Sequence, residues 1–125
     1  MPNTKPIRKA PYRLNPQKAD WLHNHLEELK ADGRIKESDS CFASPVILVP
    51  KPNGDFRMGC DYLGLNSICK SIDMFPLPRV DNLMDRVGQA KYLTKLDATK
   101  GYLAVPFDDE SVPYTAFITA QGLFQ

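Results

Sequence analysis

An aspartate that ends an apolar run is the residue of this sequence best suited to chemistry. Residues 92–96 are mostly apolar and lead directly into Asp97, and Gly101 and Tyr102 follow a few positions later. A carboxylate at the end of a strand could hold a metal cation, because hard cations prefer oxygen ligands. Aspartate is also a common cap of tight turns. Spacing alone leaves both interpretations open: a turn cap, or a ligand for something charged.

Positively charged side chains gather in two segments. Lys51 and Arg57 flank the turn-forming sequence 52–54, and the first thirteen residues contain bases but no acid. The bases of this N-terminal arm are Lys5, Arg8, Lys9 and Arg13. Such an arm is either a solvated start of the chain or a contact for an anion such as nucleic acid. The net charge of +1 adds no argument for nucleic acid or for a membrane.

The composition is that of one modest globular domain in a reducing compartment. The 125 residues are 42% hydrophobic and 25% charged, and the three cysteines have no C-x-x-C spacing. This argues against a disulfide framework and a zinc site, so we expect an intracellular protein, cytoplasmic or nuclear. No apolar segment follows Met1, and no run approaches the roughly 20 apolar residues of a membrane span. We therefore expect neither secretion nor a membrane partner.

The elements expected to position these residues begin with a helix and a hairpin. Asn15-Pro16 predicts a helix start with proline at the first helical position, and Gly33 predicts its end. Three leucines between them share one helix face: Leu22, Leu26 and Leu29. A polar connector, residues 37–44, follows. Residues 46–62 predict a β-hairpin, because an apolar run and an alternating run flank a glycine-containing turn.

The second half of the chain predicts shorter elements. Residues 80–88 have the apolar spacing of an amphipathic helix ended by glycine, and residues 91–97 predict the strand that presents Asp97. Two further strands are expected at residues 104–107 and 114–119, around an acidic turn. Residues 122–125 start another apolar strand that has no partner after it. We interpret this as a domain whose sheet is truncated.

These motifs, in this order, resemble a known family. The stretches "SPVILVPKPNGDFRMGCDYLGLN", "FPLPRVDNLMDRVGQAKYLTKLDATKGY", "TAF" and "GLFQ" are similar to the start of the reverse transcriptase domain of gypsy-type LTR retrotransposon Pol polyproteins. Each motif alone is weak, but their order and spacing are specific, and the resemblance runs from about Pro11 to Gln125. It implies an α+β fold: the fingers and the first part of the palm of a right-hand polymerase, truncated before the second catalytic motif.

The resemblance divides the chain and assigns the metal ligands. It implies an extended basic arm at 1–13, fingers at 14–70, the start of the palm at 71–103 and a return to the fingers at 104–125. The implied activity is RNA-directed DNA polymerization, in which two Mg²⁺ ions act on the primer 3′-OH and the incoming dNTP. Asp97 would be the first metal carboxylate, and the Ala98 carbonyl a further ligand. The implied partners are an RNA or DNA template-primer, dNTP and the rest of a Pol polyprotein.

The resemblance also assigns residues to the dNTP. Backbone N–H groups around Lys100 and Gly101 would face the triphosphate, and Tyr102 would pack under the sugar and exclude a 2′-hydroxyl. Arg57 matches a fingers arginine that binds the triphosphate, and Lys51 is a second cation there. We expect nucleic acid to bind through Arg8, Lys9 and Arg13 of the arm.

Several departures from the family pattern lead to three hypotheses. Leu63 stands where the family has a template-supporting arginine, and Gly59 weakens a strand. The 125 residues contain no Y-x-D-D motif, and Asp108-Asp109 follows Asp97 too closely to replace it. Our first hypothesis is a polymerase fragment that is inactive alone, since one carboxylate cannot hold two Mg²⁺ ions against their repulsion. The alternatives are a co-opted, non-enzymatic nucleic-acid-binding module and a decayed element product without function.

Overall fold

The computed structural model describes residues 5–69, 78–88, 90–98 and 101–125, which fall into two compact units. Met1–Cys69 and Pro106–Gln125 form the first unit, and Lys70–Val105 form the second. Of the described residues, no helix is long and apolar enough to cross a bilayer. Each unit is described separately below.

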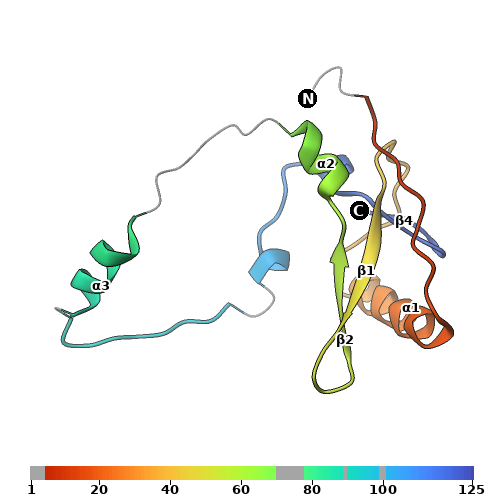
Figure 1. The fold of residues 1–125 in the computed structure, drawn as a ribbon. Coiled ribbons are helices and arrows are strands. Elements are labelled where there is room, and N and C mark those ends of the chain that lie inside the picture. Colours follow the sequence, from red (N-terminus) through yellow and green to blue (C-terminus); the bar gives the residue numbers. More distant parts are fainter. Residues whose placement is uncertain (1–4, 70–77, 89, 99–100) are drawn as a thin grey trace. The chain divides into compact units, whose positions relative to one another are not determined.

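The first unit is built on a four-stranded sheet of order β2-β1-β3-β4. Along the chain come α1 (Pro16–Ala31), β1 (Ser44–Pro50), β2 (Phe56–Cys60), α2 (Leu63–Ile68), β3 (Phe117–Thr119) and β4 (Gly122–Phe124). β1 pairs antiparallel with β2 and parallel with β3, and β3 pairs antiparallel with β4. Figure 1 shows this sheet, with the hairpin of β1 and β2 as its long ladder.

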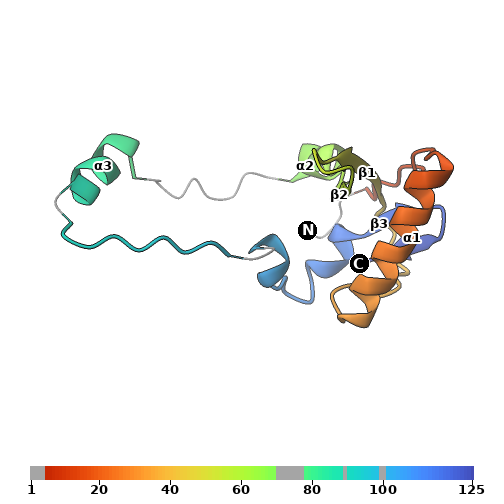
Figure 2. The same ribbon diagram turned by 90° about the horizontal axis from the view of Figure 1, so that it is seen from below.

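The predicted helix is confirmed at both ends. The Asn15 side chain accepts a hydrogen bond from the backbone N–H of Lys18 at 2.9 Å, and proline occupies the first turn. At the other end Gly33 adopts a φ of +67°, which a side chain with a Cβ rarely tolerates. The three leucines on one face are buried, and Leu26 is 0% exposed. α1 therefore lies against β1 and β3 (Figure 2), where Leu22 and Leu26 pack with Val46, Leu48, Phe117 and Phe124.

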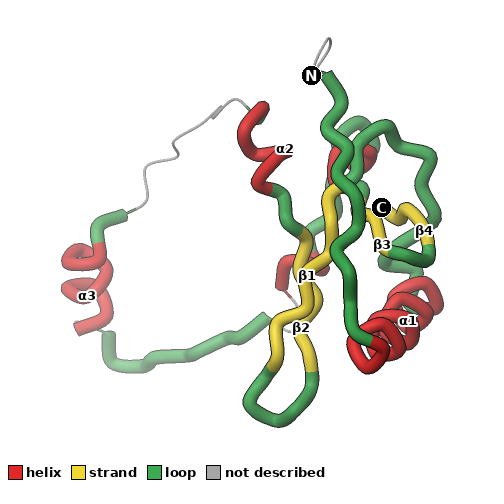
Figure 3. Tube along the Cα trace, turned by 45° about the vertical axis from the view of Figure 1, so that its right-hand side comes forward, coloured by secondary structure: helices red, strands yellow, loops and turns green. Residues whose placement is uncertain are grey.

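The predicted hairpin is also confirmed. Val46 of β1 lies opposite Cys60 of β2, and Pro50 lies opposite Phe56. Gly54 closes the turn at a φ of +83°, and the Lys51 N–H donates to the Asp55 carbonyl at 2.7 Å. In Figure 3 this turn forms the end of the ladder farthest from α2.

Two strand predictions for the C-terminal part need correction. Residues 104–107 form no strand, and Pro106 has no N–H to donate to a ladder. Of residues 114–119, only Phe117–Thr119 are a strand, because Val112–Thr115 form a 3₁₀ helix with proline in its first turn. The last strand forms as predicted, at Gly122–Phe124, and both of its neighbours precede it in the chain. β4 pairs with β3, and on its other side Gln125 exchanges two backbone hydrogen bonds of 2.9 Å with Lys36.

The second unit contains one predicted helix and lacks one predicted strand. α3 (Val80–Gly88) begins and ends as predicted, and all its described side chains are exposed. Residues 91–97 are not a strand, so that prediction is wrong. A strand needs a neighbour to take its backbone N–H and C=O groups, and no strand pairs with 91–97 among the described residues. The exposure of Leu96, 90%, reflects the same lack of a packing partner.

Candidate functional site

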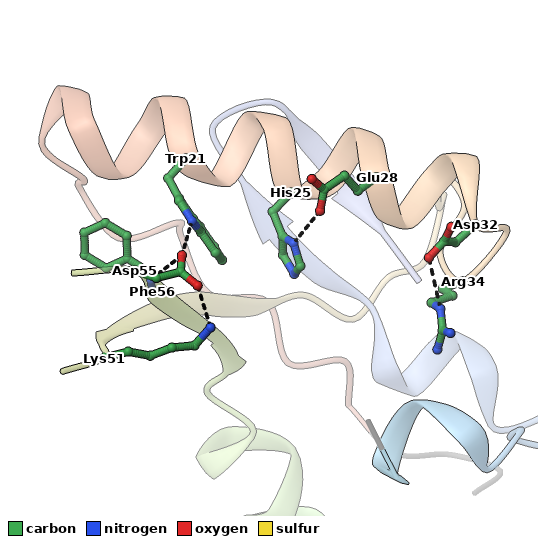
Figure 4. Close-up of polar contacts among 8 residues, drawn as sticks. All are labelled: Trp21, His25, Glu28, Asp32, Arg34, Lys51, Asp55 and Phe56. Atoms are coloured by element: carbon green, nitrogen blue, oxygen red, sulfur yellow. Dashed lines mark hydrogen bonds and ion pairs between the residues drawn. The ribbon is translucent and has the colours of Figure 1, made fainter. Parts of the chain in front are cut away.

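The tip of the hairpin is organised around the carboxylate of Asp55 (Figure 4). Its Oδ2 accepts from the Lys51 ammonium at 2.6 Å, and its Oδ1 accepts from the Trp21 indole N–H at 2.7 Å. The backbone N–H of Phe56 also donates to Oδ1, at 2.8 Å. Hydrogen bonds from Lys51, from the Phe56 backbone and from Trp21 lower the pKa of Asp55 from 3.8 to about 2. Asp55 is therefore an anion at any physiological pH, and it accepts from three donors: one in the turn, one on β2 and one on α1.

Trp21 fastens this tip to α1. Its ring stacks on His25, with centroids 4.8 Å apart and 29° between the planes, and it meets the Phe56 ring edge-on at 5.7 Å. The Lys18 ammonium lies 5.8 Å from the centroid of the Phe56 ring. Aromatic contacts of this kind add to the energy of burial. The hairpin tip is thus docked on the first half of α1.

The two cations predicted to bind triphosphate differ in their availability. Lys51 is paired with Asp55 across the turn. Arg57 is exposed, and among the described residues it has no hydrogen-bond or ion-pair partner. Alternation along β2 explains the exposure, because Phe56, Met58 and Cys60 face the core and Arg57 points away from it. The hairpin therefore presents one open cation and one that is held.

The described part of the N-terminal arm contacts the segments that flank β1 and β2. Arg8 lies opposite Ala43 in a parallel β-bridge, in which the Ala43 N–H donates to the Ile7 carbonyl and the Lys9 N–H donates to the Ala43 carbonyl, each at 3.0 Å. The Arg8 guanidinium donates to the Ser40 carbonyl at 3.3 Å. Asp61, directly after β2, accepts from the Tyr12 hydroxyl at 2.8 Å and from the Lys9 ammonium at 3.3 Å. The Tyr12 hydrogen bond is the largest cause of the lowered pKa of Asp61, and the same bond raises the pKa of Tyr12.

Of the arm residues predicted to bind nucleic acid, only Arg13 is open. Arg8 and Lys9 make the contacts above, whereas Arg13 is exposed and makes no side-chain hydrogen bond or ion pair in the described part of the chain. It borders a cavity of about 300 Å³ between the arm, α1 and the turn after β3, lined also by Leu22, Val46 and Gln121. The cavity walls are mainly apolar, and Arg13 is the one cationic side chain among the residues that line the cavity.

The predicted catalytic segment lies in the second unit. Asp97 and Ala98 are exposed, and Gly101 and Tyr102 begin a 3₁₀ helix, Gly101–Ala104. Lys100 lies outside the described residues. Asp97 offers the hard oxygen ligand that Mg²⁺ prefers, but within the described ranges no group of three acidic, histidine or cysteine side chains could hold a metal ion. The described residues therefore do not fit a complete two-metal site.

Four residues of the site were not anticipated from sequence: Trp21, Asp55, Asp61 and Tyr12. Asp55 stood in a turn, where aspartate is common, and nothing local showed that a helix 34 residues away donates to it. Tyr62 likewise has no local sequence signal for its contact. Its hydroxyl donates to the Thr115 carbonyl at 2.8 Å, and burial is the main cause of its raised pKa.

In this fold a β-hairpin packs on a helix, and the chain passes through a second unit before β3 and β4 join the same sheet. This arrangement is the start of a right-hand polymerase fold: the fingers with the first part of a palm. Solved structures of the prototype foamy virus protease-reverse transcriptase superpose on it. A selenomethionine-labelled mutant gives a TM-score of 0.77 at 27% identity, covering 98% of this chain and 16% of that chain. The foamy viral protein in complex with dsDNA gives a TM-score of 0.74 at 22% identity, again over 98% of this chain.

The chain belongs to the family described as reverse transcriptase (RNA-dependent DNA polymerase), whose sequence profile matches residues 49–125. It is 32% identical to the Pol polyprotein from transposon 297 of Drosophila melanogaster, over 98% of this chain and 12% of that protein. A putative enzymatic polyprotein of Cassava vein mosaic virus is 35% identical over 98% of this chain and 20% of its own length. The chain thus spans a fifth or less of these relatives.

Proposed function

We propose that this chain is the fingers and the start of the palm of an RNA-directed DNA polymerase from a gypsy-type LTR retrotransposon. The polymerase adds deoxynucleotides from dNTP to a primer 3′-OH on a template. The observation that supports this best is the family match over residues 49–125, which includes both the hairpin arginine and the Asp97 segment. The hairpin observed around Arg57 is consistent with the role because it leaves that guanidinium open to solvent.

Each proposed role follows from the chemistry of the side chain. Arg57 would bind the triphosphate by charge-assisted hydrogen bonds, which the planar guanidinium makes in pairs. Lys51 would add a second positive charge on the same hairpin. Asp97, with the carbonyl of Ala98, would supply oxygen ligands to Mg²⁺. In such polymerases the metal ions neutralise charge that develops on the reacting oxygens.

Lys100, Gly101 and Tyr102 complete the proposed dNTP site. The backbone N–H groups near Lys100 and Gly101 would bind phosphate oxygens, for which a glycine allows close approach. The ring of Tyr102 would lie under the sugar. Tyr102 is 100% exposed, so no contact inside the described chain occupies it.

The second metal carboxylates are proposed to come from elsewhere in a Pol polyprotein. The 125 residues contain no Y-x-D-D motif, and Asp97 alone cannot hold two divalent ions together. We therefore propose that the 125-residue chain has no polymerase activity by itself.

Primer extension on the purified chain tests this proposal. An RNA template with a DNA primer, dNTP and either Mg²⁺ or Mn²⁺ should give no extended product, and Asp97→Asn should change nothing. A whole Pol polyprotein of a relative serves as the positive control. Extension by the wild-type chain that Asp97→Asn abolishes would show that the site is complete without further residues.

Nucleic-acid binding without catalysis is the second candidate, and the open side chains of Arg13 and Arg57 favour it. Leu63 begins α2 and is 75% exposed at the position where the family has a template-supporting arginine. Leu63→Arg should therefore tighten binding to a labelled RNA–DNA hybrid, by at most about 1–3 kcal/mol for a charge-assisted contact to phosphate. Fluorescence anisotropy measures this. Equal affinity of the two proteins would remove position 63 from the template contact.

A further inference from the structure

We propose that Asp55 is a positioning residue that holds the Lys51 ammonium at the hairpin tip, so that a polyphosphate reaching the hairpin must compete with this carboxylate for Lys51. The inference rests on the proposed function of the hairpin. It assigns to Asp55 a control of substrate affinity, in addition to its packing in the turn.

The two oxygens of Asp55 have separate tasks. Oδ2 accepts from Lys51, at 2.6 Å, whereas Oδ1 accepts from Trp21 and from the Phe56 backbone. The turn itself has its own fastenings, since the Lys51 N–H donates to the Asp55 carbonyl at 2.7 Å and the Asp55 N–H donates to the Asn53 side chain at 3.2 Å. Removing the charge at Oδ2 therefore releases Lys51 while Oδ1 can still receive its two donors.

Lys51 is within reach of a ligand from solvent. Its side chain is 37% exposed and that of Asp55 is 41% exposed, so the pair lies at the surface of the hairpin tip. Because Asp55 stays ionised well below neutral pH, it competes for Lys51 throughout the physiological pH range. A polyphosphate carries several charges and can displace a single carboxylate, whereas Arg57 needs no such displacement.

Trp21 supplies a signal for this event. It is the only tryptophan of the chain, and its indole N–H donates to the same carboxylate that holds Lys51. When Lys51 leaves Oδ2, the Asp55 carboxylate loses the positive charge beside it, so the electrostatic field at the indole N–H changes. The indole N–H resonance and the tryptophan emission should then change together with polyphosphate binding.

The test titrates inorganic tripolyphosphate into the purified chain and measures binding to every protein by isothermal titration calorimetry, while the Trp21 indole resonance and emission are followed in the proteins that keep both Lys51 and Asp55. Four proteins form a cycle: wild type, Asp55→Asn, Lys51→Ala and the double variant. Asp55→Asn should tighten binding about two- to fivefold, the scale of an exposed ion pair. The gain should vanish when Lys51 is absent. Asp55→Ser, also uncharged, should repeat the gain and guards against a folding fault peculiar to asparagine.

Asp32→Asn is the matched control for loss of one negative charge. Asp32 follows the far end of α1 and pairs with Arg34 at 3.4 Å, away from the hairpin tip (Figure 4). It should leave the affinity unchanged. An equal gain from Asp32→Asn, or a gain from Asp55→Asn that persists without Lys51, would overturn the proposal, because both indicate a general effect of charge.

Arg57→Ala separates this inference from the proposed function. If tripolyphosphate binds and Arg57→Ala weakens it, but Asp55→Asn has no effect, the hairpin keeps its proposed role and Asp55 does not control it. If no protein of the series binds tripolyphosphate, or if Arg57→Ala has no effect, the hairpin is not a triphosphate site and both proposals fail.

Discussion

Leu26→Ala should remove a large part of the stability of the first unit. Leu26 is 0% exposed and lies in one cluster with leucine, valine and phenylalanine side chains of α1, β1, β3 and β4. Leucine-to-alanine changes at such sites cost about 2–5 kcal/mol, more when the surroundings cannot collapse into the cavity. Since the neighbours stand on paired strands, we expect about 3–5 kcal/mol. A whole domain is typically stable by only about 5–15 kcal/mol.

Urea unfolding followed by the emission of Trp21 measures this loss, because Trp21 packs against this cluster. Leu96→Ala is the matched control: the same change in a side chain that is 90% exposed should alter the unfolding free energy by less than about 0.5 kcal/mol. A loss below about 1 kcal/mol for Leu26→Ala, or equal losses for the two variants, would refute the assignment of the core to this cluster.

Three other predictions concern pH, the end of α1 and nucleic acid. Because the pKa of Asp55 is lowered to about 2 in the folded chain, its stabilising contribution is present above its ordinary pKa of 3.8 and is lost as pH falls from there through about 2. Urea midpoints of wild type should fall over this range more steeply than those of Asp55→Asn; equal slopes would show that the hydrogen bonds to Asp55 do not form. Gly33→Ala should cost about 1–2 kcal/mol because φ is +67° there, whereas Gly88→Ala, where φ is not positive, should cost far less in the same melt. Binding to a duplex should have a slope of log K against log salt near −1.8, since about two phosphates can meet the open Arg13 and Arg57. A slope steeper than about −3 in anisotropy titrations would mean that paired cations such as Lys9 also bind phosphate.

Local signals in the sequence predicted the elements whose ends have their own chemistry. Asn15-Pro16 and Gly33 set the ends of α1, and Gly54 set the turn of the hairpin, because caps and positive φ values depend on a few adjacent residues. The buried face of α1 followed from the spacing of its leucines. These features survive any tertiary arrangement, so one sequence is enough to find them.

The remaining features depend on partners distant along the chain. Residues 91–97 have the composition of a strand, but a ladder needs a neighbour, and none of the described strands pairs with them. The neighbours of the last strand could not be predicted either, because one of them is the connector around Lys36, which has no strand pattern. The pairing of Lys9 could not be predicted either, because its partner Asp61 lies 52 positions away in the sequence.

The candidate site divides in the same way. The residue types at Asp97, Arg57 and Lys51 were readable because the motifs that contain them are contiguous. The sequence did not show whether each side chain is paired, because pairing depends on the folded hairpin. There Lys51 pairs with Asp55, and Arg57 has no partner among the described residues. The packing of the hairpin on Trp21 could not be predicted from local sequence, because Trp21 and Asp55 are 34 positions apart.

The role of Asp97 in a reverse transcriptase is the central claim, and a chimaeric polymerase tests it most directly. This chain would replace the segment that it matches in the transposon 297 Pol polyprotein, and primer extension would be compared for Asp97, Asp97→Asn and Asp109→Asn. Circular dichroism and thermal unfolding confirm that each variant is folded. We predict extension by the unmodified chimaera, a loss of at least about 100-fold for Asp97→Asn and little change for Asp109→Asn. A folded chimaera that is inactive, or that extends equally well with Asp97→Asn, would contradict the account.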